Sequence, residues 1–211
     1  MSVSVIGVVL ILGLTAVSVV FRVTGARKNL QTAHSLCALL ENVFQPLEKT
    51  YTNIGGVVGY HISYTLQPPF TLLDGTLTLF PRQALFYYPI ARFLGRQDEL
   101  SFSLKVDFPM VGEAHLVQKD AYRFGRFAID NFKEMESEEI SVKGVPYLLL
   151  YYNRIQAGKI ADLMRRLSEV NSYEQFSFYG YQRLFYFHVN PSAESLEKQL
   201  RNLAEILSSC G

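Results

Sequence analysis

The sequence predicts an α+β protein, in which an N-terminal single transmembrane helix is followed by one mainly antiparallel sheet with helices packed on it. Three observations predict this class. The first 21 residues carry no charged side chain, strand-like and helix-like segments alternate afterwards, and no repeat or linker divides the chain. We therefore expect an anchor over residues 1–22, an amphipathic connecting helix over 23–50 and one cytosolic α+β domain over 51–211.

The predicted anchor is the run from Ser2 to Phe21, which is dominated by Val, Ile and Leu. A helix of about 20 residues is about 30 Å long, the thickness of the hydrocarbon core of a bilayer. A cleaved signal peptide would have a basic start, a shorter apolar core and a cleavage site between small residues. The run has none of these features. We expect an uncleaved anchor; a removed signal and a buried core helix are the alternatives.

Basic residues predict the orientation of this anchor. Arg22, Arg27 and Lys28 follow the apolar run directly, and no basic side chain precedes it. Because loops rich in Lys and Arg stay on the cytosolic side, the N-terminus should lie outside and the C-terminal domain in the cytosol. The membrane would be the plasma membrane of a prokaryote or the endoplasmic reticulum of a eukaryote.

The segment after the anchor should be an amphipathic helix. Pro46 should kink or end this helix, and His34 should lie beside its apolar stripe, at the surface. Apolar residues recur there at intervals of three and four, the spacing of one helix face: Leu30, Ala33, Leu36, Cys37, Leu40, Val43, Phe44 and Leu47.

The next segments predict a sheet interrupted by one short helix. Residues 55–66 are rich in β-branched and aromatic residues, and a turn at Asp74-Gly75 should start a second strand. Residues 82–95 predict a short helix interrupted by proline. Residues 99–108 alternate apolar and polar side chains, as a half-buried strand does, and 113–119 should pair with that strand.

The C-terminal part alternates strand and helix more regularly. Residues 145–153 predict a buried strand, 157–170 an amphipathic helix, and 174–190 two aromatic strands on either side of Gly180. The acidic run 133–140 predicts a solvated face or loop, since it lacks the glycine and spacing of a cation loop.

The last helix should start at Pro191 with Asn190 as its N-cap. One apolar seam should pack it onto the sheet, formed by Leu196, Leu200, Leu203 and Leu207.

Composition excludes some functions and predicts others. The 20 basic and 19 acidic residues give no overall field for nucleic acid, so we expect no DNA partner. Cys37 and Cys210 are too few for a disulfide framework and lack metal-type spacing. No nucleotide-binding, hydrolase or metalloprotease motif occurs, so we expect no enzyme, metal or cofactor. The alternative is a membrane-tethered hydrolase, in which His61, His115 or His188 meets a carboxylate in the fold.

Aromatic residues are the compositional feature that stands out. The chain has 13 Tyr and 15 Phe but no Trp. These side chains would fill a sheet core, or leave part of an aromatic surface open near the membrane for an apolar partner. The candidate partner-binding residues are Phe86, Tyr87, Tyr88, Arg165, Arg166, Phe178, Tyr179 and Tyr181.

The order of these elements resembles the membrane-anchored cytosolic domain of the calumin family, the coiled-coil-domain-containing subunit of the PAT complex. The similarity covers most of residues 3–209. It includes the helix "KNLQTAHSLCALLENVF", the segment "PIARFL" before "DELSFSLKVDF", and the strand "SYEQFSF" before the last helix. The chain lacks the acidic luminal extension and the basic C-terminal coiled coil of that family. A compact prokaryotic relative, such as an archaeal one, would fit these differences.

The resemblance implies a non-enzymatic role in the insertion and folding of membrane proteins. Partners would be the Sec translocon, an insertase of the YidC/Oxa superfamily, or a small membrane chaperone subunit such as Asterix. Without the basic coiled coil, a ribosome contact is less expected, and no functional residue of the family carries over to a position here. A structural subunit of a membrane complex, with the aromatic strands as its interface, is the alternative.

Overall fold

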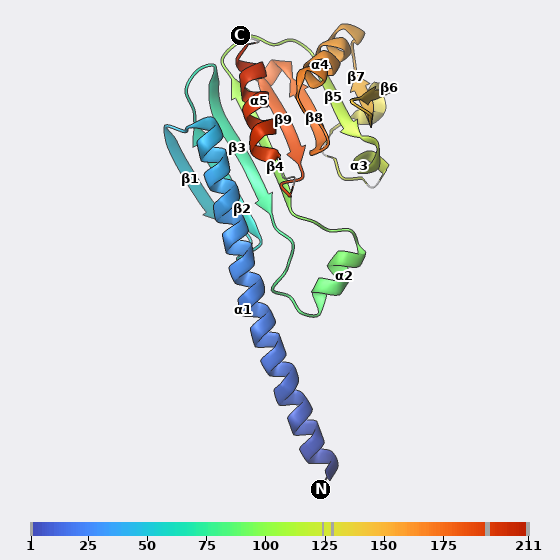
Figure 1. The fold of residues 1–211 in the computed structure, drawn as a ribbon. Coiled ribbons are helices and arrows are strands. Elements are labelled where there is room, and N and C mark those ends of the chain that lie inside the picture. Colours follow the sequence, from blue (N-terminus) through green and yellow to red (C-terminus); the bar gives the residue numbers. More distant parts are fainter. Residues whose placement is uncertain (1, 124, 128, 193–194, 210–211) are drawn as a thin grey trace.

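The computed structural model describes residues 2–123, 125–127, 129–192 and 195–209. It contains a nine-stranded antiparallel sheet with helices packed on it and one long N-terminal helix that extends away from the sheet (Figure 1). The α+β class predicted from the sequence is confirmed. The strands follow the order β1-β2-β3-β4-β9-β8-β5-β7-β6.

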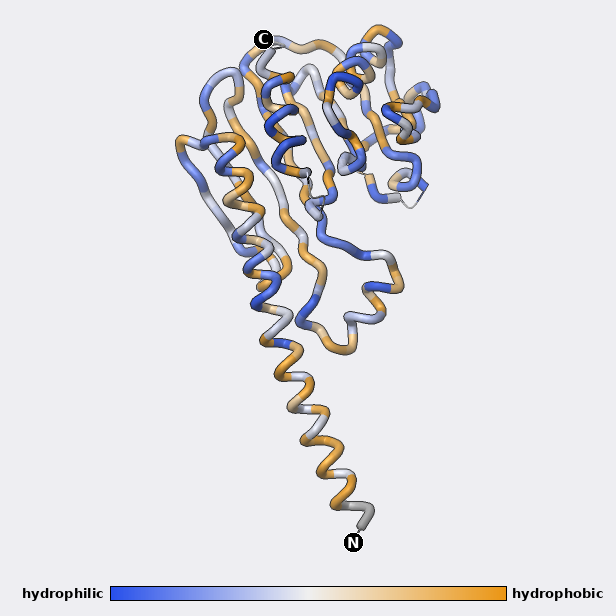
Figure 2. The backbone as a smooth tube through the Cα atoms, in the orientation of Figure 1, coloured by the Kyte–Doolittle hydropathy of each residue, from blue (hydrophilic) through white to orange (hydrophobic). Residues whose placement is uncertain are grey.

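Helix α1 runs from Ser2 to Phe44 without a break, so the predicted anchor and connecting helix are one rod. At about 1.5 Å per residue, its 43 residues are about 65 Å long. The apolar N-terminal part projects free of the domain (Figure 2). Among the described residues it is the one helix that is long and apolar enough to span a membrane, and none of its most apolar window is buried.

The C-terminal half of α1 packs on the sheet through one stripe. Of the predicted positions, Leu30 and Leu47 are exposed, and Asn29 is buried in place of Leu30. The helix ends two residues before Pro46, and strand β1 starts at Glu48. Residues 48–50 are therefore strand, although the sequence placed them in the connecting helix. The inward positions are Gly25, Asn29, Ala33, Leu36, Leu40 and Phe44.

The first half of the sheet is an antiparallel meander of β1 (Glu48–Asn53), β2 (Gly59–Thr65), β3 (Phe70–Thr78) and β4 (Glu99–Val106). The predicted turn at Asp74-Gly75 is wrong, because both residues lie inside β3. Gly75 pairs with Phe102, and a Cβ at Gly75 would lie 2.8 Å from the Cβ of Phe102. Close packing, and not a turn, requires this glycine.

The second half consists of β5 (Glu113–Gln118), β6 (Glu136–Val142), β7 (Val145–Tyr151), β8 (Tyr173–Tyr179) and β9 (Leu184–Val189). Strand β9 pairs with β4 and joins the two halves, while β5 pairs with β7 and β8. The predicted pairing of β5 with β4 is therefore wrong. The acidic run forms the edge strand β6, whose side chains are mostly exposed.

Helices α4 (Arg154–Arg166) and α5 (Leu196–Ser208) cover the same face of the sheet as α1 (Figure 1). Helix α5 starts five residues later than predicted, although Asn190 accepts a hydrogen bond from the Ser192 backbone amide at 2.9 Å, as an N-cap residue does. All four leucines of the predicted seam are buried.

Aromatic rings form the centre of this core. The ring of Phe187 stacks on Phe102 at 5.0 Å and on Phe176 at 4.9 Å between centroids, so one stack joins β4, β9 and β8. Such pairs add about 0.5–1.5 kcal/mol each to the apolar burial. The aromatic strands β8 and β9 are therefore mainly core.

The opposite face is polar except for a small second core. The short helices α3 (Lys119–Arg123) and η1 (Phe132–Glu134) lie within the chain that covers this core, behind β5 and β7. Its buried residues are Val117, Ala121, Ile129, Met135 and Leu150. Helix α2 (Tyr87–Phe93) stands apart from the sheet, beside α1 (Figure 1).

Candidate functional site: an apolar cleft beside α4

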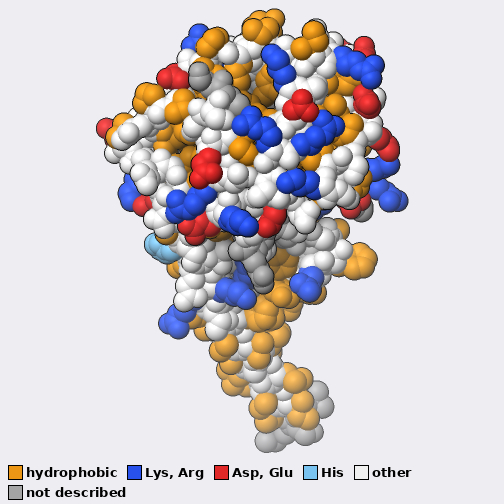
Figure 3. All heavy atoms as spheres, turned by 45° about the horizontal axis from the view of Figure 1, so that its top comes forward, with side chains coloured by type: hydrophobic (Ala, Val, Ile, Leu, Met, Phe, Trp, Pro, Cys, Tyr) orange, Lys and Arg blue, Asp and Glu red, His pale blue; other side chains and the backbone are white. Residues whose placement is uncertain are grey.

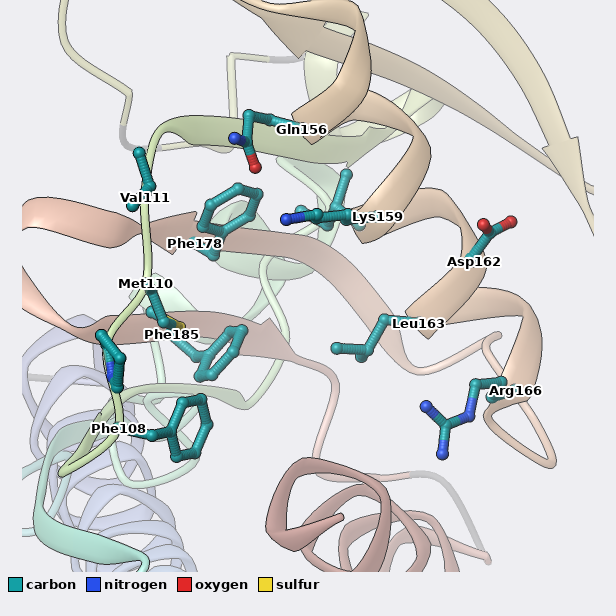
Figure 4. Close-up of a pocket in the computed structure, with 12 residues that line it drawn as sticks. Phe108, Met110, Val111, Gln156, Lys159, Asp162, Leu163, Arg166, Phe178 and Phe185 are labelled. Carbon is teal, nitrogen blue, oxygen red and sulfur yellow. The ribbon is translucent and has the colours of Figure 1, made fainter. Parts of the chain in front are cut away.

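An open cleft lies between α4 and the segment 108–112, which connects β4 to β5 (Figure 4). Its volume is about 440 Å³, within the range of small-ligand and peptide side-chain pockets. Its lining residues are Phe108, Pro109, Met110, Val111, Gln156, Lys159, Ile160, Asp162, Leu163, Arg166, Phe178 and Phe185.

The floor and walls of the cleft are apolar because β8, β9 and α4 turn apolar side chains toward it. Phe178 of β8 and Phe185 of β9 point from the sheet into the floor (Figure 4). Helix α4 turns Ala157, Ile160, Ala161 and Met164 onto the core. Leu163, one position round the helix, stays half-exposed and faces the cleft. An apolar side chain that entered would be removed from water on several sides.

The 108–112 wall is held by backbone packing. The Gly180 amide donates to the Gly112 carbonyl at 2.7 Å, and Gly112 has a φ of +88°, which favours glycine. A Cβ at Gly180 would lie 2.6 Å from that carbonyl oxygen. The turn between β8 and β9 therefore fixes the edge of the cleft, and both glycines are needed for it.

The rim of the cleft is more basic than acidic. Lys159 and Arg166 line it, and Asp162 is neutralised in part by Arg165, whose guanidinium lies 2.7 Å from its carboxylate. The Arg166 guanidinium donates a hydrogen bond to the Ser209 hydroxyl at 3.0 Å, so it points toward the C-terminal end of α5. An apolar floor with a basic rim suits an apolar segment that carries acidic or C-terminal charge.

Helix α4 and the segment 108–112, which form the two sides of the cleft, lie at the end of the sheet away from the exposed half of α1 (Figure 1). Figure 3 looks onto that end, where basic, acidic and hydrophobic side chains are interspersed. Strand β4 runs from one end of the sheet to the other. It starts at Glu99, next to the segment that contains α2, and ends at Val106, before the cleft. Its eight residues span about 25 Å.

The predicted partner-binding residues do not form one surface. Phe178 and Arg166 line the cleft, and Arg165 contributes to its rim. Tyr181 follows Gly180 and is 91% exposed next to the cleft edge. Tyr179 points to the opposite face, where its ring lies 5.2 Å from His115.

The three other predicted residues, Phe86, Tyr87 and Tyr88, lie at the anchor end, in and next to α2. Sequence reasoning also missed the wall residues Phe108 and Met110. The signal was the apolar "FPMV" run between two strands, where a polar turn is the usual connection.

The predicted orientation residues lie directly beyond the apolar part of α1. Arg22, Arg27 and Lys28 are all exposed, whereas Gly25, which lies between them, and Asn29, which follows Lys28, are buried against the domain. The guanidinium and ammonium groups are thus free to meet lipid headgroups or water.

The chain matches no protein-family model and no curated protein.

The three strand histidines each lie near a carboxylate, but in different settings. His61 and Asp74 are 3.1 Å apart on the open face of the sheet, where both are about two-fifths exposed. His115 lies 3.0 Å from Glu113, and its side chain is fully buried. Burial lowers the pKa of His115 to about 4, so it is neutral at pH 7.

His188 lines a hollow on the sheet. This hollow, of about 260 Å³, lies on the face opposite the helices, and Glu99, Ser101 and Tyr186 also line it. The His188 Nε2 and Glu99 Oε2 atoms are 3.9 Å apart, beyond hydrogen-bond distance. Glu99 therefore does not orient the His188 imidazole through a direct hydrogen bond in this geometry.

No group of three or more His, Cys, Asp or Glu residues that could hold a metal ion occurs in the part of the chain that the structure describes. Burial, with a smaller contribution from Glu41, raises the pKa of the Cys37 thiol to about 11, so it stays protonated and weakly nucleophilic. Cys210 lies outside the described residues.

Proposed function

We propose that this chain is a non-enzymatic, membrane-anchored binding protein that holds an apolar segment of a partner protein in the cleft beside α4. The observation that carries the proposal is the apolar cleft with a basic rim, built on a domain from which an apolar helix of membrane-spanning length projects. The anchor keeps the domain at one membrane, and the cleft supplies the contact.

The exit charges support a cytosolic position of the domain. The C-terminal end of the apolar run is followed by the basic residues Arg22, Arg27 and Lys28. Positive residues next to a membrane span stay on the cytosolic side. The N-terminal end of α1 then faces outward. The cleft opens away from the bilayer, toward chains that approach the membrane from the cytosol.

The partner class follows from the resemblance to the calumin family. We propose that the chain assists the insertion or folding of membrane proteins near the Sec translocon or an insertase of the YidC/Oxa superfamily. Segments of such clients are apolar and are exposed before insertion, so a cleft that shields a few side chains would reduce their aggregation.

Site-directed photocrosslinking in intact membranes tests the proposal. A photoreactive residue replaces Met110 in the cleft, and a matched one replaces Leu72, which lies on the opposite face of the sheet. We expect the probe at Met110, and not the probe at Leu72, to crosslink to a translocon or insertase subunit or to a membrane-protein client. Crosslinks only to unrelated soluble enzymes, or equal products from both positions, would contradict the proposal.

A second variant tests whether the crosslinks depend on the apolar cleft or arise from non-specific adhesion. Leu163→Glu places a carboxylate on the half-exposed wall of the cleft, at a side chain that packs against the core without being fully buried in it. We expect the Met110 crosslinks to fall while the fold, measured by circular dichroism, stays unchanged. Asp162→Ala, on the same rim, is the control that should retain the crosslinks.

The alternatives have less geometric support. The interpretation as a structural subunit started from the aromatic strands, whose rings instead lie mainly in the core. The interpretation as a hydrolase has His61, His115 or His188 as its base. His61 lies on the open face of the sheet, His115 is fully buried, and His188 stands 3.9 Å from the carboxylate of Glu99.

A further inference from the structure

The segment between β3 and β4 carries the most exposed apolar surface of the described domain. We call residues 81–98 the α2 lobe. The side chain of Phe93 is 91% exposed, and no described part of the chain covers the apolar side chains around it. On a water-soluble domain such a dense patch marks a contact with another apolar phase or molecule. The exposed members are Phe86, Tyr87, Ile90, Phe93 and Leu94.

The α2 lobe lies beside α1 where the apolar half of that helix ends. The Tyr88 ring packs edge-on against Phe21, the last residue of the apolar run, with centroids 5.5 Å apart. Behind it, a Cβ at Gly25 would lie 2.3 Å from the Arg82 carbonyl oxygen, so the two backbones touch there. If α1 spans a bilayer up to Phe21, the lobe lies at the level of the lipid headgroups.

A buried polar network fixes the lobe at that height. Both guanidinium Nη atoms of Arg82 donate to the Asp98 carboxylate, at 2.8 and 2.7 Å, and the Phe80 amide donates to it at 2.8 Å. The Asn29 amide of α1 donates to the Phe80 carbonyl at 3.0 Å and accepts from Arg82 at 2.9 Å. Paired charges of this kind hold one geometry, so the exposed apolar residues keep a defined position relative to α1.

Charge is distributed so that the anchor end of the molecule is basic. Residues 1–40 and the lobe contain one acidic side chain, Asp98, which is buried against Arg82; Glu99, the next residue, lines a hollow together with Arg96. The remainder of the chain has more acidic than basic residues, since the whole chain carries a net charge of +1. A positive end attracts a membrane surface that contains anionic lipids. The basic residues at this end are Arg22, Arg27, Lys28, Arg82, Arg92 and Arg96.

From these observations we infer that the α2 lobe is embedded in the interface of the bilayer, with Phe93 and its apolar neighbours among the phospholipid acyl chains and Arg92 and Arg96 among the headgroups. This inference rests on the proposed membrane anchoring of α1. Continuity favours lipid over a protein partner, because the apolar patch adjoins the apolar surface of α1. Tyr and Phe beside basic residues are typical of membrane-interface segments.

Such a second contact would fix the orientation of the domain. A single helix can tilt and rotate in a bilayer, whereas a helix with an embedded lobe at its side is held against both motions. The cleft beside α4 would then keep a constant height and direction above the membrane.

The absence of tryptophan from the chain allows a direct test. Single-tryptophan variants of the full chain are reconstituted into vesicles of phosphatidylcholine and phosphatidylglycerol, with and without brominated acyl chains. Phe93→Trp probes the lobe, and Tyr181→Trp, equally exposed at 91% on the far end of the sheet, is the matched control. Leu10→Trp, in the apolar half of α1, reports whether the anchor has inserted.

We expect Phe93→Trp to emit at shorter wavelength than Tyr181→Trp and to lose intensity in brominated vesicles, as Leu10→Trp does, while Tyr181→Trp is unaffected. If Leu10→Trp is quenched and Phe93→Trp behaves like Tyr181→Trp, the embedded lobe is refuted and the anchor stands. If Leu10→Trp is not quenched either, the anchoring and the lobe contact are both refuted. Because no other protein is present, a lobe that waits for a protein partner gives the first of these two results.

Discussion

Asp98 is a buried carboxylate on which the position of the α2 lobe depends. It is 5% exposed and accepts three hydrogen bonds, two of them from Arg82. Bonding to Asp98 also raises the pKa of Arg82, so the guanidinium stays charged. The network joins α1, the end of β3 and the start of β4 through side chains far apart in sequence.

Asp98→Asn should therefore destabilise the full chain. The amide keeps the size of the carboxylate but leaves Arg82 without its counter-charge, which costs about 3 kcal/mol when one partner of a largely buried pair is lost. Denaturant unfolding of the detergent-solubilised chain measures the loss, and hydrogen exchange should rise over residues 80–98. The exposed pair Asp162–Arg165 is the control: Asp162→Asn should change the unfolding free energy by less than about 1 kcal/mol.

His115 makes the stability depend on pH. Burial lowers its pKa in the folded chain from 6.5 to about 4. Burial also raises the pKa of its neighbour Glu113, with a contribution from Asp130, which weakens the attraction that would favour a charged imidazole. Between these pH values the unfolded chain binds a proton that the folded chain does not. The contribution to stability is complete above about pH 6.5 and is lost as the pH falls toward about 4.

His115→Gln should remove this dependence. The difference in unfolding free energy between the wild-type chain and the variant should change by roughly 3 kcal/mol between pH 7 and pH 4. Denaturant titrations at several pH values measure it, with His34→Gln, an exposed histidine on α1, as the control. A difference that is constant with pH would contradict the buried neutral imidazole.

At the scale of elements, Gly25 decides how closely α1 and the α2 lobe approach. A helix interior ordinarily gains about 1 kcal/mol when glycine becomes alanine. At Gly25 that gain is opposed by the Arg82 carbonyl, 2.3 Å from the new Cβ, and by neighbouring backbone atoms that cannot rotate away. The helix and the lobe would have to move apart.

Gly25→Ala should thus destabilise the chain, whereas Gly158→Ala in α4 should stabilise it by roughly 0.5–1 kcal/mol, because nothing lies within 4 Å of a Cβ at Gly158. Denaturant unfolding of both variants in the same detergent gives the two signs. Equal stabilisation by both substitutions would mean that the lobe does not pack against α1 as described.

Elements with strong periodicity were predictable, and edge strands were not. Strand β4 alternates apolar and polar residues, and β7, β8 and β9 contain the apolar and aromatic runs that a buried strand requires. Every residue of β1 is exposed, so its sequence carries no buried face to reveal it. Strand β6 is acidic for a related reason, since charge protects an edge from pairing with another chain.

The strand pairing was also not predictable, because it joins residues that lie far apart in the sequence. The insertion of β9 next to β4 places a strand from residue 184 onward beside one that ends at residue 106, and no local pattern encodes this. The cleft depends on the same long-range contact. Phe178 and Arg166 were identified from composition, but the walls at Phe108 and Leu163 required the fold.

At the scale of the whole molecule, the two contacts that we propose lie at opposite ends of one sheet. The anchor and the α2 lobe lie at one end, and the cleft beside α4 lies at the other (Figure 1). Because α1 is one continuous helix, the sheet is coupled rigidly to the apolar segment. A domain held in this way can present the cleft at a set distance from the membrane.

We predict that three basic residues set the orientation of that arrangement in the membrane. Replacing Arg22, Arg27 and Lys28 together by glutamate reverses the charge bias next to the anchor, and that bias acts within about 15–20 residues of a span. In a prokaryotic host, where the anchor would lie in the plasma membrane, a tag at the C-terminus should be protected from protease added outside the cells in the wild-type chain. It should be accessible in part of the population of the variant. The control replaces Lys49, Lys105 and Lys119, which are too far along the chain to count. It should leave the tag protected, and an accessible tag in the wild-type chain would reverse the proposed side of the cleft.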